Sequence, residues 1–207
     1  MCKKVFSMIV ALALLQLLRI GVKGLVFQVL DRTIWTDEFV SSLYMLAATG
    51  MFLAAARKRR IKLHLFPATF SCGYKIGTMA VLAFFAATPV ITQSVSPAGL
   101  VSLVYHAVIT VVFEEVLFRG FVYQAVKKEW AAWSLSTFLF GVWHLGYVNT
   151  VLWRTSQFFP QADLVQIMFW KVMTGLAIGA LLGLFRWKSG NVYSAMLVHM
   201  FINTLGR

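Results

Sequence analysis

The chain has 207 residues, of which 60% are hydrophobic and only 13% are charged, and its mean hydropathy is +0.78. Soluble domains average about 45–50% apolar and about 25% charged residues, so the composition excludes an ordinary soluble enzyme and predicts an integral membrane protein. The formal net charge of +12 lies in short clusters between apolar runs, as topology signals do, and we therefore expect no nucleic-acid partner.

The apolar residues form seven runs, which predict an all-α integral membrane protein. At about 20 residues per span, the chain has room for roughly six to eight spans and for no sizeable soluble domain. We expect a polytopic bundle of about seven transmembrane helices, with the active site buried between core helices. The runs cover residues 5–29, 39–56, 66–92, 99–123, 131–152, 164–185 and 190–205.

The first run is the weakest of the seven. Met1–Lys4 and the apolar residues that follow resemble a signal sequence, but a small-residue cleavage site is lacking, so we expect a retained span. Arg19 and Lys23 interrupt the run. A short span followed by an interfacial segment is therefore the alternative.

Strongly basic segments occur in every second connection between runs. The connections between them are balanced or uncharged: Asp31, Arg32, Asp37 and Glu38 follow the first run, and residues 92–99 carry no charge. Because basic loops stay on the cytoplasmic side, we expect a cytoplasmic N-terminus and a C-terminus on the opposite side. The basic segments are Lys3-Lys4, Arg57–Lys62, Lys127-Lys128 and Arg186–Lys188.

Three glycines recur every four residues in the sixth run, at Gly175, Gly179 and Gly183. Small residues at this spacing let two helices approach closely. We interpret them as ordinary packing inside the bundle rather than as a dimerisation face.

Two adjacent carboxylates, Glu114 and Glu115, lie in the apolar stretch Val108–Val122. A charge near the centre of a bilayer costs several kcal/mol, so such residues are candidates for function. Arg119 follows Glu115 at i+4 and can neutralise it on the same helix face. Glu114 has Phe118 at that position and must find its partners on another helix.

Other polar groups at membrane depth lie in the fifth and seventh runs. His199 and Asn203 are four residues apart and can face one point, and Phe140 and His144 share that spacing. His106 precedes Glu114 by eight residues and is a candidate for an indirect role, whereas His64 is expected in solvent beside a basic loop.

Two chemistries suit this set of residues. One is metal-assisted hydrolysis, in which Glu114, His144 and His199 bind a divalent metal such as zinc. The other needs no cofactor: a buried carboxylate takes a proton from water, and histidine and asparagine side chains donate hydrogen bonds to the developing oxyanion.

These residues resemble the CPBP family of intramembrane proteases, named for CAAX-protease and bacteriocin-processing members and also called the Abi family. The resemblance covers residues from about 100 to 207, and the three motifs occur in the family's order. They read Glu114-Glu115-x3-Arg119, Phe140-x3-His144 and His199-x3-Asn203.

The resemblance implies an endopeptidase in which Glu114 activates the attacking water and His144 also holds it. It implies an oxyanion site made by His199 and Asn203, with Glu115, Arg119 and Phe140 in supporting positions. The family was first described as metalloproteases, but its best-understood members look metal-free, so we favour no cofactor and keep zinc as the alternative.

The resemblance also implies a membrane-associated peptide or protein as substrate, with roles in CAAX-type processing, peptide or bacteriocin maturation, or immunity. The short length and the basic loops suggest a bacterial cytoplasmic membrane. We expect one domain, with variable N-terminal helices in 1–98 and the catalytic core in 99–207. The alternatives are a non-catalytic immunity or scaffold protein and, with less support, a small transporter.

Overall fold

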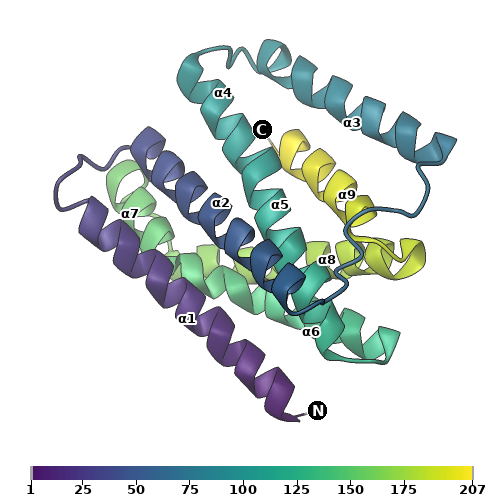
Figure 1. The fold of residues 1–207 in the computed structure, drawn as a ribbon. Coiled ribbons are helices and arrows are strands. Elements are labelled where there is room, and N and C mark those ends of the chain that lie inside the picture. Colours follow the sequence, from purple (N-terminus) through teal and green to yellow (C-terminus); the bar gives the residue numbers. More distant parts are fainter. Residues whose placement is uncertain (1, 207) are drawn as a thin grey trace.

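The computed structural model describes residues 2–206, and the regular structure within them is entirely helical. This confirms the predicted all-α fold. Figure 1 shows the helices in chain order: α1 (Cys2–Val26), α2 (Ile34–Lys58), α3 (Cys72–Ile91), α4 (Pro97–Val104), α5 (Thr110–Glu115), α6 (Glu129–Trp143), α7 (Val148–Phe158), α8 (Leu164–Ser189) and α9 (Val192–Leu205).

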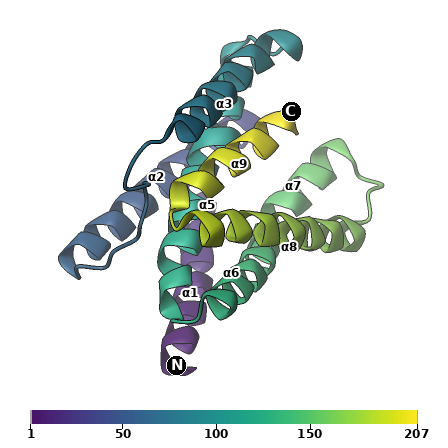
Figure 2. The same ribbon diagram turned by 90° about the vertical axis from the view of Figure 1, so that its right-hand side faces the viewer.

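Helices α4 and α5 belong to one uninterrupted helix, Pro97–Ala125, which we call the central helix. Two π-helical segments, Tyr105–Ile109 and Val116–Val122, flank α5 within it. The central helix contacts α2, α6 and α9. Figure 2 shows the chain reversing between α8 and α9 beside it. Both glutamates of the first motif therefore lie at the middle of the bundle.

Five helical stretches among the described residues are long and apolar enough to cross a membrane, and α9 is a shorter apolar helix. The protein is accordingly an integral membrane protein. Every one of the seven predicted runs contains a helix. The five long stretches are Lys3–Val26, Ile34–Lys58, Cys72–Ile91, Pro97–Ala125 and Leu164–Ser189.

The first run forms one continuous helix, so the alternative of a short span followed by an interfacial segment is wrong. Arg19 and Lys23 lie within α1 with only 1% and 3% of their surface exposed. Lys23 pairs with Asp37 at 2.8 Å. Arg19 donates to the carbonyl oxygen of Gly146 and, at 2.9 Å, to Oδ1 of Asn149. Contacts inside the protein replace water around both cations.

Three charged residues that were expected in connections are instead buried inside helices. Asp37 and Glu38 are buried in the first turns of α2. Arg186 is buried in the last turn of α8, where its Nε donates to the carbonyl oxygen of Arg119 at 3.3 Å. A hydropathy profile falls at a charge whether that charge is solvated or paired in the interior, so the expected boundaries fell short of these residues.

The third run begins later than expected, because residues 66–71 precede α3 as a loop. The two residues just before this loop lie along the start of α9: the Val192 amide donates to the His64 carbonyl at 2.9 Å, and the Tyr193 amide to that of Leu65 at 2.8 Å. These bonds satisfy N–H groups that a helix start leaves unpaired. The side chain of His64 is exposed, as expected.

The glycine stripe of α8 packs against α6 within the same chain. A Cβ atom at Gly179 would lie 3.1 Å from the Phe140 ring, and one at Gly183 would lie 2.6 Å from the ring of Trp133. At Gly175 it would lie 2.8 Å from Nδ1 of His144. The interpretation as intramolecular packing is therefore confirmed, and the stripe brings α8 directly against the second motif.

Candidate active site

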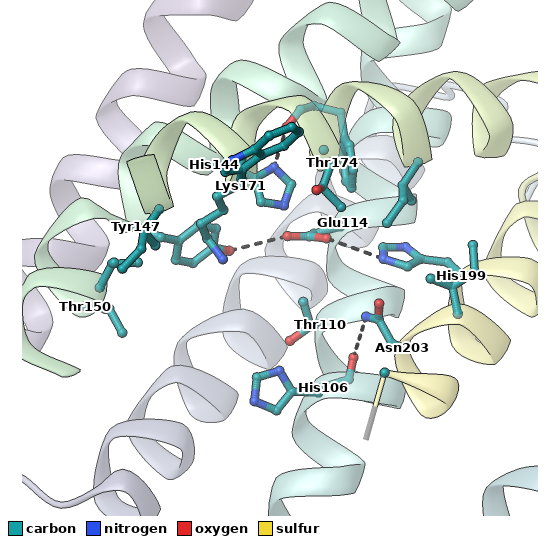
Figure 3. Close-up of a pocket in the computed structure, with 18 of the residues that line it drawn as sticks. His106, Thr110, Glu114, His144, Tyr147, Thr150, Lys171, Thr174, His199 and Asn203 are labelled. Atoms are coloured by element: carbon teal, nitrogen blue, oxygen red, sulfur yellow. Dashed lines mark hydrogen bonds and ion pairs between the residues drawn. The ribbon is translucent and has the colours of Figure 1, made fainter. Parts of the chain in front are cut away.

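A cavity of about 790 Å³ lies between the central helix, α6, α7, α8 and α9. Figure 3 shows its polar lining, with Glu114 near the middle. We call it the central cavity. Its lining includes all four predicted catalytic residues, Glu114, His144, His199 and Asn203, and also Phe140, His106, Tyr147, Arg154 and Lys171.

Glu114 is only 3% exposed and finds its partners on other helices, as the sequence indicated. The Tyr147 hydroxyl donates to Oε1 of Glu114 at 3.4 Å. Oε2 of Glu114 lies 3.9 Å from Nε2 of His199. The carboxylate is thus held from two sides by groups on different helices while it faces the cavity.

Glu115 and Arg119 form the predicted ion pair, with both side chains fully buried and Nη1 of Arg119 3.2 Å from Oε1 of Glu115. Arg119 also donates to the carbonyl oxygen of Gly179 at 3.0 Å. The guanidinium lies 4.3 Å from the ring centroid of Phe140. This pair therefore ties the central helix to α8 and α6 and does not line the cavity.

His199 bridges the two glutamates. Its Nδ1 lies 2.9 Å from Oε1 of Glu115, and its Nε2 faces Glu114. A carboxylate accepts hydrogen bonds, so Nδ1 carries the proton that binds Glu115. The second ring nitrogen is then left for the cavity, which is how a second partner fixes the orientation and tautomer of a functional histidine.

His144 is oriented by its own helix. Its Nδ1 donates to the carbonyl oxygen of Phe140 at 2.8 Å, at the predicted spacing of four residues. A carbonyl can only accept, so the lone pair of the neutral ring lies on Nε2. Gly175 on α8 leaves the space that the ring fills. The nitrogen that is free of the backbone is therefore the one available to a water or a substrate.

Asn203 lines the cavity one turn beyond His199 on α9. Its Nδ2 donates to the carbonyl oxygen of His106 at 2.9 Å. That contact uses one of the two amide protons and leaves the other and Oδ1. His106 is held in turn by Glu38 of α2, with Nε2 3.1 Å from Oε1. His106 thus reaches Asn203 through its backbone rather than through its ring.

Two cavity residues were missed by the sequence reasoning, Tyr147 and Lys171. Lys171 lies inside the sixth apolar run, so the rule that marked Glu114, an ionisable residue at membrane depth, applies to it equally. Tyr147 follows His144 by three residues in the 3₁₀ turn His144–Tyr147 that separates α6 from α7. No pattern in the sequence indicated that turn.

The predicted alternative metal ligands are Glu114, His144 and His199. Across residues 2–206, no group of three or more His, Cys, Asp or Glu side chains is placed closely enough to hold a metal ion. His199 donates through Nδ1 to Glu115, which leaves Nε2 as the nitrogen that could face a cation. Because the three side chains as placed do not form a group that could hold a metal ion, we assign no chemical step to one.

Comparison with known proteins gives one family. A family model described as type II CAAX prenyl endopeptidase Rce1-like matches residues 96–205, just over half of the chain. The match confirms the resemblance drawn from the three motifs. Neither the curated proteins nor the solved structures include a match to this chain.

Proposed function

Because this chain belongs to the family of type II CAAX prenyl endopeptidase Rce1-like proteins, we propose that it hydrolyses a peptide bond in a membrane-associated peptide or protein, with Glu114 as the general base. The observation that carries this proposal is the meeting of Glu114, His144, His199 and Asn203 in one cavity. Three separate stretches of sequence supply them, and each group is costly at membrane depth.

In the proposed reaction, Glu114 takes a proton from a water that Nε2 of His144 also binds. The hydroxide attacks the peptide carbonyl carbon, and the oxyanion accepts hydrogen bonds from His199 and Asn203. The C–N bond then breaks, and the proton held by Glu114 passes to the leaving amine. His199 already donates through Nδ1 to Glu115, so it donates through Nε2 when the ring carries both protons.

The test measures cleavage by the purified protein in lipid nanodiscs. The probes are a farnesylated peptide ending in a C-a-a-X motif and an apolar leader-type peptide without lipid, with products identified by mass spectrometry. Glu114→Gln should lower the rate by about 10²–10⁴-fold, the usual contribution of a general base. Glu129→Gln, an exposed glutamate outside the cavity, is the matched control.

Two further measurements belong to this experiment, metal removal and a comparison of the two probes. Activity should survive complete metal removal by a chelator, and its loss with recovery on adding zinc would instead establish a metalloprotease. The probe that is cleaved separates CAAX-type processing from leader or bacteriocin maturation. Wild-type protein that is folded but cleaves neither probe, and that binds one of them equally well after Glu114→Gln, would favour a scaffold or immunity role.

We also propose the predicted orientation in a bacterial cytoplasmic membrane, with a cytoplasmic N-terminus. Figure 1 supports it, since the N-terminus, the end of α2 and the connection before α6 lie at one end of the helices, opposite the α3–α4 connection. The test uses a cysteine-free background and a membrane-impermeant maleimide. Gln161→Cys should react in intact cells, and Lys128→Cys only after lysis.

A further inference from the structure

Lys171 differs from the other buried or partly buried cations of this protein. Arg119 pairs with Glu115, Arg154 with Glu38, and Lys23 with Asp37. Across the described residues, Lys171 has neither a hydrogen-bond nor an ion-pair partner. Its Nζ lies 5.6 Å from the ring centroid of Tyr147. The acidic residue that acts on it electrostatically is Glu114, but no hydrogen bond joins the two among the described residues.

Lys171 is on α8, in the stretch Leu164–Ser189 that is long enough to span a membrane, and it lines the central cavity. An ammonium group at such a depth is costly unless an anion or a cavity compensates for lost hydration. Arg154 lines the same cavity, and its buried Nε also has no hydrogen-bond partner within residues 2–206. The ammonium group of Lys171 and the Nε proton of Arg154 thus both lack a hydrogen-bond acceptor on this side of the cavity.

The position of Lys171 relative to the reacting groups is informative. In Figure 3, Lys171, Tyr147 and Thr150 lie on one side of Glu114, whereas His199 and Asn203 lie on the other. A substrate whose scissile carbonyl oxygen lies toward His199 and Asn203 has its opposite side toward the part of the cavity that holds Lys171. An anionic group on that part of the substrate would meet the unpaired ammonium.

We propose that Lys171 binds a carboxylate of the substrate peptide and so helps to select which peptides the central cavity accepts. The inference rests on the proposed peptidase function and adds a preference for substrates that carry a negative charge. Peptides carry this anion in two forms, the C-terminal α-carboxylate and an acidic side chain. Either would form a charge-assisted hydrogen bond with Nζ.

The test compares three versions of one dansyl-labelled, farnesylated decapeptide: a free C-terminal acid, a C-terminal amide, and an amide with glutamate as its last residue. Wild-type protein should prefer a carboxylate-bearing version over the plain amide by about 10- to 100-fold in kcat/KM. Lys171→Met should abolish that preference through KM, and Lys171→Arg should keep most of it. Lys188→Met, an exposed lysine of the same helix, should change nothing.

The two carboxylate versions show which form of the anion is recognised. A loss in Lys171→Met that is equal for all three peptides would overturn the proposal, because it would mean that Lys171 supports Glu114 instead of the substrate. An absent preference in the wild type would overturn it as well. Binding of the acid and amide peptides to Glu114→Gln, with and without Lys171→Met, gives a readout without cleavage, so failure of the peptidase proposal is recognised separately.

Discussion

Residues 2–95 and residues 96–205 contribute differently to the central cavity. The family match and all three motifs lie in the second part. The first part supplies none of the residues that line the cavity, but α1 and α2 hold several of those that do. Arg19 donates to Gly146 and lies 4.7 Å from the ring centroid of Tyr147, and Glu38 pairs with His106 and Arg154.

The groups proposed to react and the residues that support them are thus separated along the chain. The second part provides every group proposed to react, and its buried ion pair lies directly behind Glu114 and His199. The first part contacts residues around the cavity without lining it, through buried polar groups near the end of α1 and the start of α2. Substitutions in the second part should therefore affect the reacting groups directly, whereas substitutions in the first part should have smaller, indirect effects.

The largest difference is expected between the two buried ion pairs. Arg119→Met leaves Glu115 fully buried with only His199 as a partner and should lower the free energy of unfolding by about 3–5 kcal/mol. Lys23→Met should cost less, because Asp37 keeps Arg32 at 2.7 Å. Unfolding in mixed detergent micelles measures both, and equal losses would contradict the comparison.

A second expected difference uses two glycines. Gly175→Ala places a Cβ 2.8 Å from Nδ1 of His144, whereas a Cβ at Gly21 of α1 meets nothing within 4 Å. A displacement of a reacting group by about 1 Å can cost 10²-fold in rate. We expect kcat to fall about 100-fold in Gly175→Ala and to stay unchanged in Gly21→Ala. Normal kcat in Gly175→Ala would mean that the position of His144 is unimportant.

A smaller effect is expected from the contact between the two parts at Tyr147. Arg19→Met removes the hydrogen bonds to Gly146 and Asn149 and the cation above the Tyr147 ring. Because Tyr147 binds Glu114, kcat should fall about tenfold, the equivalent of one hydrogen bond to a charged group. Lys4→Met, at an exposed position of α1, is the control. Unchanged kcat in a folded Arg19→Met protein would show that α1 gives no support to the site.

The smallest expected effect is that of Glu38→Gln. Glutamine keeps one acceptor for His106 or Arg154 but removes the charge, and both partners are about one-third exposed. Partly exposed ion pairs contribute about 1 kcal/mol or less. Peptide cleavage should therefore fall by about two- to fivefold, measured beside Glu129→Gln. A loss as large as that of Gly175→Ala would place α2 within the catalytic part.

The sequence predicted the helices well, because apolar runs are local properties. It predicted the meeting of the three motifs because ionisable groups at membrane depth must find partners on other helices. The contacts of Tyr147 and Lys171 were not predictable in that way, since they depend on how α7 and α8 are placed against Glu114. Asp37, Glu38 and Arg186 were assigned to connections because a buried charge with a protein partner and a solvated charge give the same dip in hydropathy. The glycine stripe predicted close packing, but only the structure identifies α6 as its partner.

The π-helical segments of the central helix have a consequence for insertions and deletions. A π turn holds an extra residue, and each residue of an α-helix accounts for about 100° of rotation. Removing one residue from Tyr105–Ile109 would therefore restore regular α geometry there, while α4 and the glutamates of α5 kept their orientation about the helix axis. The same deletion in a regular α-helical stretch would turn everything beyond it by that angle. One-residue gaps in family alignments are therefore expected in these two π-helical segments.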